Sequence, residues 1–200
     1  LAASAQDIPY GTGSWDRQKL GNHRAVIEVS SDTDAVWVHI PWRRRDDNPQ
    51  EKALILVDAS SGKVVRNVYN VTINQEFADL VFEPVTGQGI YYLYYMPYVT
   101  VGNWWCPDTK YLRPEDHCDP QWIRENNLKD GFAPHEKIPL AKVIRFEAIN
   151  EFNSFYPMEV IATKQEITSL LEKNKSRDFL VFPEDRKYPI RMTGHLHHRW

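Results

Sequence analysis

The sequence predicts a mainly-β protein: an antiparallel β-sandwich with one well-marked helix and a long loop insertion. Short apolar segments that alternate like strands recur along the chain, and turn residues separate them about every 8 to 12 residues. Residues 164–174 combine a capping box with helical spacing of apolar side chains, which predicts the helix. Across residues 99–140 the strand pattern stops and proline recurs, which predicts the insertion. We expect residues 6–200 to form a single domain.

The segment Gln88–Tyr98, with the sequence QGIYYLYYMPY, predicts a central strand. It is uncharged, rich in aromatic residues and of a length that suits a strand. Because strand side chains alternate, it has two bulky faces: Tyr91, Leu93 and Tyr95 on one side, and Ile90, Tyr92, Tyr94 and Met96 on the other. One interpretation is that both faces are core. The other is that one tyrosine face forms, with Trp104 and Trp105, a platform for a flat ligand.

The first half of the chain predicts six further strands. An ordered lead-in over residues 6–22, anchored by Trp15, precedes them. The first two strands alternate clearly, with Ala25, Ile27 and Val29, and then Val36, Val38 and Ile40, on their inward faces. Ser60–Lys63 predicts a hairpin turn. The expected strands cover residues 23–29, 35–40, 53–59, 64–69, 71–76 and 80–83.

The second half of the chain begins with the insertion. Within it, Asp119 and Pro120 suit an N-cap and a first helical position, so residues 121–125 predict a short helix. A strand follows at 141–149, where Ile144, Phe146 and Ala148 would share a face. Further strands are expected at 156–162, 179–182 and 188–192.

The composition excludes several classes of function. A chain of 200 residues that is 42% hydrophobic and 26% charged can bury a sizeable core. The net charge of −3 gives no basic surface for nucleic acid. No apolar run approaches the roughly 18 residues of a membrane span. We therefore expect no nucleic-acid partner, no membrane partner and, since no motif implies one, no cofactor.

The N-terminus and the cysteines bear on the compartment. Ala3, Ser4 and Ala5 resemble the end of a signal peptide, so residues 1–5 predict a signal-peptide remnant and a secreted or periplasmic protein. In an exported protein Cys106 and Cys118 would pair, and we expect that disulfide. In a cytosolic protein they would be free thiols or half of a metal site.

The run from Arg43 to Asp47 is the densest group of charges. One interpretation is an internal ion-pair network at a strand end, joined by Glu184, Asp185 and Arg186. The alternative is that Arg44 or Arg45 holds an acidic or hydroxyl-rich ligand, since arginine binds carboxylates through two parallel hydrogen bonds.

Aromatic residues near turns extend this candidate ligand site. Indole faces stack on sugar rings, although tryptophans in loops also cover cores, as Trp122 could. The candidate ligand-binding residues are Trp42, Arg44, Arg45, Asp46, Tyr95, Tyr98, Trp104 and Trp105.

No catalytic or metal-binding residue is assigned. The sequence has no G-x-S-x-G, no H-E-x-x-H and no phosphate-binding loop. Glu147, Glu151 and Glu159 lie on or near expected strands, where ion pairing is the more common role. The histidines at 195, 197 and 198 lack an acidic partner at fixed spacing, so no metal site is expected there.

A group of motifs is distributed along the chain, at residues 20–24, 41–46, 81–84, 87–91, 94–98, 152–159, 182–186 and 189–192. Together these motifs resemble the N-terminal region of secreted glycoside-hydrolase-like proteins related to glycoside hydrolase family 123. The resemblance covers residues 10–200.

The resemblance implies a β-sandwich followed by a barrel that carries the catalytic acids and acts on N-acetylgalactosaminides by substrate assistance. The barrel would lie beyond Trp200, so no catalytic residue of the family is carried over. The implied function is a non-catalytic domain that supports this barrel, its partner in the same chain, and contacts glycan. Two alternatives are open: a self-sufficient carbohydrate-binding module or lectin, and a complete small hydrolase with an unrecognised carboxylate pair.

Overall fold

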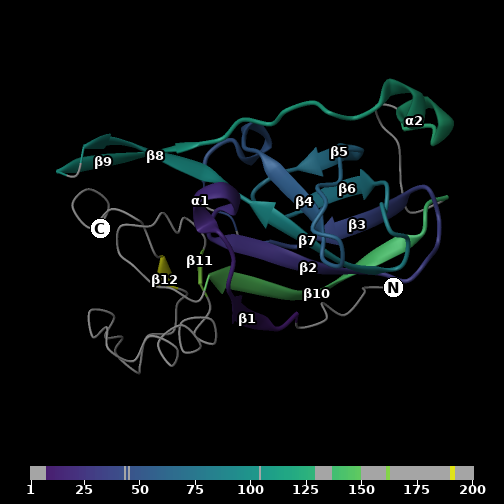
Figure 1. The fold of residues 1–200 in the computed structure, drawn as a ribbon, viewed down its shortest axis with the longest axis horizontal. Helices are drawn as coiled ribbons and strands as arrows, with labels where there is room; N and C mark the ends of the chain where they lie inside the picture. Colours follow the sequence, from purple (N-terminus) through teal and green to yellow (C-terminus); the bar gives the residue numbers. More distant parts are fainter. Residues whose placement is uncertain are drawn as a thin grey trace.

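Two sheets packed face to face form the body of the protein in a computed structural model (Figure 1). The structure describes residues 8–42, 44, 46–103, 105–128, 137–149, 161–162 and 190–191. The first sheet contains β4 (Leu54–Asp58), β7 (Gly89–Tyr95), β2 (His23–Val29) and β10 (Leu140–Ile149), with β1 (Tyr10–Gly13) alongside β10. The second contains β3 (Val36–Ile40), β6 (Ala78–Phe82) and β5 (Val68–Ile73). The mainly-β, sandwich-type prediction is confirmed.

Strand β10 belongs to both sheets. Its first residues pair in parallel with β3, through Leu140 with Trp37 and Ala141 with Val38. The rest of the strand pairs antiparallel with β2. The strand order is therefore one continuous path, β4-β7-β2-β10-β3-β6-β5, which folds over at β10. The two ends of this path, β4 and β5, are edge strands.

β7 is a central strand, as its sequence predicts, with β4 on one side and β2 on the other. Tyr91, Leu93 and Tyr95 face the core between the sheets. The rings of Tyr91 and Phe82 meet across that core, with their centroids 5.4 Å apart. The inward residues predicted for β2 and β3 lie in the same core.

A β-bulge in β10 corrects one predicted face. The register shifts between Val143 and Arg145, so Ile144 is the extra residue. A bulge reverses which side chains face inward. Val143, rather than Ile144, therefore joins Phe146 in the core, and Ile144 is only half-buried.

The strands expected at 64–69 and 71–76 are replaced by one strand, β5. Residues near Val64 form only an isolated bridge with Val57 of β4. The chain then crosses to the second sheet, where β5 pairs with β6. Propensity alone could not place this crossing, because branched residues continue through it.

The described part of the insertion 99–140 contains more regular structure than its sequence predicts. It begins with a hairpin of β8 (Tyr98–Asn103) and β9 (Cys106–Tyr111), which lies at one end of the sandwich (Figure 1). The expected short helix is present as α2 (Pro120–Glu125), at the other end, and Asp119 caps it by accepting a hydrogen bond from the Gln121 amide. α2 and its neighbours cover the outer face of the second sheet, where Trp122 packs on Ala35 and Val81.

Other elements are short. They are α1 (Arg17–Leu20), the 3-10 turn η1 (Pro49–Glu51), and the paired segments β11 (Ile161–Ala162) and β12 (Ile190–Arg191). The predicted helix 164–174, the strand 179–182, the flanks of the strands 156–162 and 188–192, and residues 1–5 lie outside the described residues. Among the described residues, no helix has the length and apolar character that a membrane span requires.

We expect Leu93→Ala to destabilise the fold by about 2 to 5 kcal/mol, because it opens a cavity in a fully buried site of the central strand. Denaturant unfolding followed by tryptophan fluorescence measures the change. Val85→Ala is the control, because Val85 is exposed and its truncation should change the unfolding free energy by less than about 0.5 kcal/mol. Equal stability of the two variants would contradict the central position of β7.

Candidate functional site

The charged segment after β3 folds into a buried ion-pair network. Arg44 donates from Nε to Oδ1 of Asp46 at 2.8 Å and from Nη2 to Oδ2 at 2.6 Å, and both side chains are completely buried. Lys52 adds a second cation, with its Nζ 2.5 Å from Asp46 Oδ2. Such two-pronged pairing is the arrangement in which arginine binds carboxylates most strongly.

Neighbouring residues hold this network in place. The guanidinium of Arg44 lies 4.6 Å from the ring centre of Trp42, whose Nε1 donates to the Asn74 carbonyl at 2.8 Å. Gln75 donates from its side chain to the Asp46 carbonyl at 3.1 Å. Within the described part of the chain, Nη1 of Arg44 is buried without a hydrogen-bond partner. The network therefore ties the end of β3 to the turn after β5.

Asp46 is held as a carboxylate. Burial by itself raises the pKa of Asp46. Hydrogen bonding and charge attraction, from Arg44 and then from Lys52, lower this pKa by more than burial raises it. The net pKa lies below the ordinary value of 3.8. The carboxyl is thus charged at neutral pH and fully engaged by cations.

The candidate ligand residues that the structure describes do not converge on a surface. Trp42, Arg44, Asp46, Tyr95 and Tyr98 are all buried, which favours the interpretation of the charged run as an internal network. Trp105, in the turn between β8 and β9, is 73% exposed and stays a predicted ligand residue. Arg45, Trp104 and the suggested partners Glu184, Asp185 and Arg186 lie outside the described residues.

The outer tyrosine face of β7 is occupied by Arg24. Its guanidinium lies 3.8 Å from the ring centre of Tyr92 and 4.5 Å from that of Trp15. It also donates to Tyr94 Oη at 3.0 Å and to Glu147 Oε2 at 2.6 Å. Gly13 fits here because a Cβ would come within 2.9 Å of Glu147 Oε2. This face is a packed cation–aromatic layer, not a flat platform.

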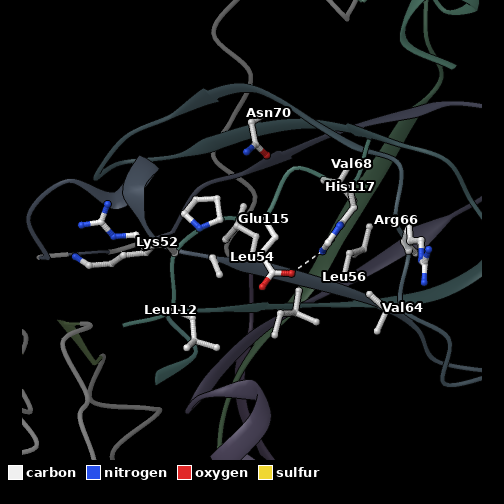
Figure 2. Close-up of a pocket in the computed structure, with 15 residues that line it drawn as sticks. Lys52, Leu54, Leu56, Val64, Arg66, Val68, Asn70, Leu112, Glu115 and His117 are labelled. Atoms are coloured by element: carbon white, nitrogen blue, oxygen red, sulfur yellow. Dashed lines mark hydrogen bonds and ion pairs between the residues drawn. The ribbon is translucent and has the colours of Figure 1, made fainter. Parts of the chain in front are cut away.

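A groove of about 500 Å³ opens between the two edge strands (Figure 2). β4 of the first sheet forms one wall, and β5 of the second sheet forms the other. Between them the walls are mostly aliphatic, with Leu54, Leu56, Val64, Val68 and Leu112. The sequence gives no signal for this groove, because its residues come from three separate segments, 52–56, 64–70 and 112–117.

The segment 112–117 borders the groove as a strap. It is attached to β4 by the hydrogen bond from the Ala53 amide to the Leu112 carbonyl, 2.8 Å long. Leu112 also donates to the Pro97 carbonyl at 2.9 Å. Along the strap, His117 and Glu115 approach to 2.7 Å, as the dashed line in Figure 2 shows.

Polar groups stand at defined points of the groove. Lys52 and Arg66 lie toward opposite ends of it in Figure 2, and Asn70 points in from β5. Arg113 lies on the strap, so the lining contains three cations besides His117 and one carboxylate, Glu115. Lys52 is already engaged by Asp46, whereas Arg66 and Arg113 form no ion pair within the described residues.

Comparison with protein families adds an independent observation. The model of the glycoside hydrolase 123 N-terminal domain matches residues 13–149, which is more than half of the chain. The chain belongs to this family. Searches of curated proteins and of solved structures give no match.

The family match coincides with the sandwich of this glycoside hydrolase 123 N-terminal domain. It begins at the last residue of β1 and ends at Ile149, the last residue of β10. The resemblance drawn from the motifs is therefore confirmed for that region. The motifs after residue 150 lie beyond the match.

Every buried carboxylate of the described glycoside hydrolase 123 N-terminal domain has a structural partner. Asp46 is bound by Arg44 and Lys52. Glu147 is bound by Arg24 and, through Oε1, by Arg145 at 2.6 Å. Asp58 accepts hydrogen bonds from Ser60 and Ser61, and although burial raises its pKa, these bonds give a net lowering. Among the described residues, no cluster of three metal-binding side chains occurs.

The predicted Cys106–Cys118 disulfide is not formed. Cys118 is a half-buried free thiol that packs with Trp122 beside α2. Cys106 opens β9 and pairs with Asn103 at the far end of the hairpin. The hairpin directs the intervening residues along the sandwich, and α2 lies at its opposite end (Figure 1). Sequence proximity suggested the pair, whereas the extended path between the residues separates them.

We expect Arg44→Ala to cost about 3 kcal/mol of unfolding free energy, because it removes the bidentate partner of a fully buried carboxylate. The folded-state pKa of Asp46 lies below 3.8, so its charge stabilises the fold above that pH, and the contribution is lost as the pH falls through the folded-state pKa. The difference in unfolding free energy between the parent protein and the Arg44→Ala variant should therefore become smaller at acidic pH. Denaturant titrations at several pH values, with the exposed Arg66→Ala as control, measure it. A variant as stable as the parent protein would support a ligand role for Arg44.

We expect the Cys118 thiol to react slowly in the folded protein. Burial, and then the charge of Asp116, raise its pKa to about 11. The thiolate fraction near pH 8 is then about 100-fold below that of a thiol with the unshifted pKa of 9.0. Alkylation of a Cys106→Ser variant, compared before and after unfolding without reductant, tests this. Fast labelling of the folded variant would contradict the buried position.

Proposed function

We propose that this domain is the non-catalytic N-terminal support of a glycoside hydrolase. It carries a catalytic barrel that follows it in the same chain. The observation that carries the proposal is the family match, which runs from the last residue of β1 to the end of β10. A secreted or periplasmic location, supported by the small residues at positions 3–5, completes the proposal.

The chemistry of the acidic residues supports a non-catalytic role. A glycosidase needs a carboxylic acid that can give up a proton, with a second carboxylate or a substrate group placed across the bond. The two carboxyls with a clear pKa shift, Asp46 and Asp58, are both shifted downward, opposite to the shift that a general acid needs. Glu115 faces His117, and among the described residues that line the groove it is the one carboxylate, so no second acid faces it across the groove.

The architecture suits a rigid support. Both ends of the matched region lie together, because β1 and the end of β10 pair through Gly13 and Ile149. The Ile149 amide also donates to the Asn22 carbonyl at 2.9 Å. A barrel that follows β10 would thus start from a point fixed on both sides by the sandwich.

Carbohydrate binding is the second candidate function. It is supported by Trp105, which exposes 73% of its surface at the turn of the β8–β9 hairpin. Exposed indole rings stack on sugars, and a single such contact gives affinities near the millimolar range, about −4 kcal/mol. The module or lectin alternative depends on this hairpin, since the other described ligand candidates are buried.

We expect the isolated chain to hydrolyse no aryl N-acetylhexosaminide and no natural glycan, because the buried carboxylates that the structure describes, Asp46, Asp58 and Glu147, are all held by structural partners. Turnover and binding are followed separately, and Trp105→Ala is the matched variant for binding. Reproducible turnover that disappears when one Asp or Glu is replaced would establish the small-hydrolase alternative instead.

The supporting role is tested in the same series with the parent protein that carries the barrel. Removal of residues 13–149 should lower the barrel's midpoint of thermal unfolding or its soluble yield, with the removal of an exposed loop elsewhere as control. A barrel that is equally stable and active alone would contradict the role of support.

A further inference from the structure

The groove between β4 and β5 is a feature that the supporting role does not use. In a sandwich, the flank where two sheets end is normally filled by core side chains or covered by a loop. Here the strap is fixed to β4 at Ala53, and the bridge between Val57 and Val64 closes the other end. Between these points β4 has no strand beside it in the described structure. The groove is therefore bordered by β4 and β5 along its walls and by the strap and the Val57–Val64 bridge at its ends.

The walls indicate an aliphatic ligand body. Leu56 belongs to the core, while Leu54 and Val68 pack against that core from the groove. Val64 is 56% exposed at the mouth. Among the described residues that line the groove there is no Trp, Tyr or Phe, so these walls lack the flat rings on which sugars stack. A volume of about 500 Å³ lies within the range of small-molecule sites.

Asn70 adds an exposed polar side chain to the groove. It lies two residues after Val68 on β5, so both side chains project from the same face of the strand. Val68 packs on the core, whereas Asn70 is exposed and lines the groove. Its amide forms no side-chain hydrogen bond within the described residues, so it can bond a ligand.

The charges favour an anion. Arg66 and Arg113 line the groove without an ion pair in the described structure, while its one carboxylate, Glu115, is paired with His117. The chain as a whole has a net charge of −3, so this excess of cations is local. Guanidinium groups bind carboxylates with good geometry.

We propose that the groove is a binding site for a medium-chain aliphatic carboxylate. The chain would lie on Leu54, Leu56 and Val68, and the carboxylate would meet Arg66 or Arg113 at the rim. This site is separate from the proposed support of a barrel, and neither depends on the other.

The test uses the purified chain and decanoate, with decyltrimethylammonium as a probe of equal chain length and opposite charge. Titration calorimetry gives affinities, and amide chemical shifts locate the site. We expect decanoate to saturate shifts at residues 54–56, 64–68 and 112–117, and to bind at least about 10-fold more tightly than the cation, as one good charge-assisted bond implies.

Variants separate the contributions of the rim and the wall. Arg66→Gln combined with Arg113→Gln should weaken decanoate at least about 10-fold, while Arg124→Gln on α2 should not. Val64→Glu should weaken it through charge repulsion, while Val85→Glu, also at an exposed valine, should not. All these positions are at the surface, so the variants are expected to fold, and thermal unfolding checks this.

Several outcomes would overturn the proposal. They are no saturable binding of decanoate, equal binding of the cationic probe, and binding that the arginine and Val64 variants leave unchanged. Shifts confined to residues outside the groove would equally exclude it. Turnover assays and barrel stability do not enter these measurements, so failure here leaves the supporting role untouched.

Discussion

The shared strand β10 is the constraint on which the rest of the structure depends. It pairs in parallel with β3 at its start and antiparallel with β2 along the rest of its length. The bulge at Ile144 lets one strand serve both sheets, because a bulge bends and twists the strand that carries it. The sandwich is thereby closed by backbone hydrogen bonds on one flank, and its two free edges, β4 and β5, meet on the other. The core and the groove are two results of the same topology.

The buried carboxylates that the structure describes hold segments of the chain in place and have no arrangement suited to catalysis. Asp46 joins Arg44, in the segment after β3, to Lys52, which follows η1, and Glu147 joins β10 to β2 through Arg24. Each carboxylate has two cations, so removing one partner leaves a costly charge in the interior. A catalytic acid needs the opposite arrangement, an apolar setting that favours the neutral form. The charged residues that suggest a ligand site in the sequence form, in the fold, ion pairs that connect separate segments of the chain.

The sequence predicts those parts of the fold that depend on local pattern. The alternation in β2, β3 and β7 identifies both the strands and their inward faces, because each is a regular strand against one core. The cap at Asp119 likewise locates α2. The prediction of strands and faces is wrong where a tertiary contact determines the local structure. The bulge in β10 changes a face, and the crossing to the second sheet turns two expected strands into β5.

The candidate site was predicted less well than the fold. The sequence identifies Arg44 and Asp46 as members of a charged cluster, yet their mutual pairing depends on burial, which residue types do not reveal. The pairing of Cys106 with Cys118 assumed that short separation in sequence means proximity. The extended strand β9 lies between the two cysteines, and each of its residues advances the chain by about 3.3 Å, so residues close in sequence are far apart in space.

The groove marks the limit of reasoning from one sequence. Val64, Val68 and Leu112 are ordinary strand residues by pattern, and only the meeting of two sheet edges with the strap makes them one wall. A flank left open by chance would be expected to carry polar or charged residues along its length, as edge strands generally do. This one instead keeps aliphatic side chains inside, with Asn70 on the inner face and arginines at the rim. That separation of apolar wall from cationic rim is the property of a site that receives an amphipathic anion, and it distinguishes the groove from an unfilled edge.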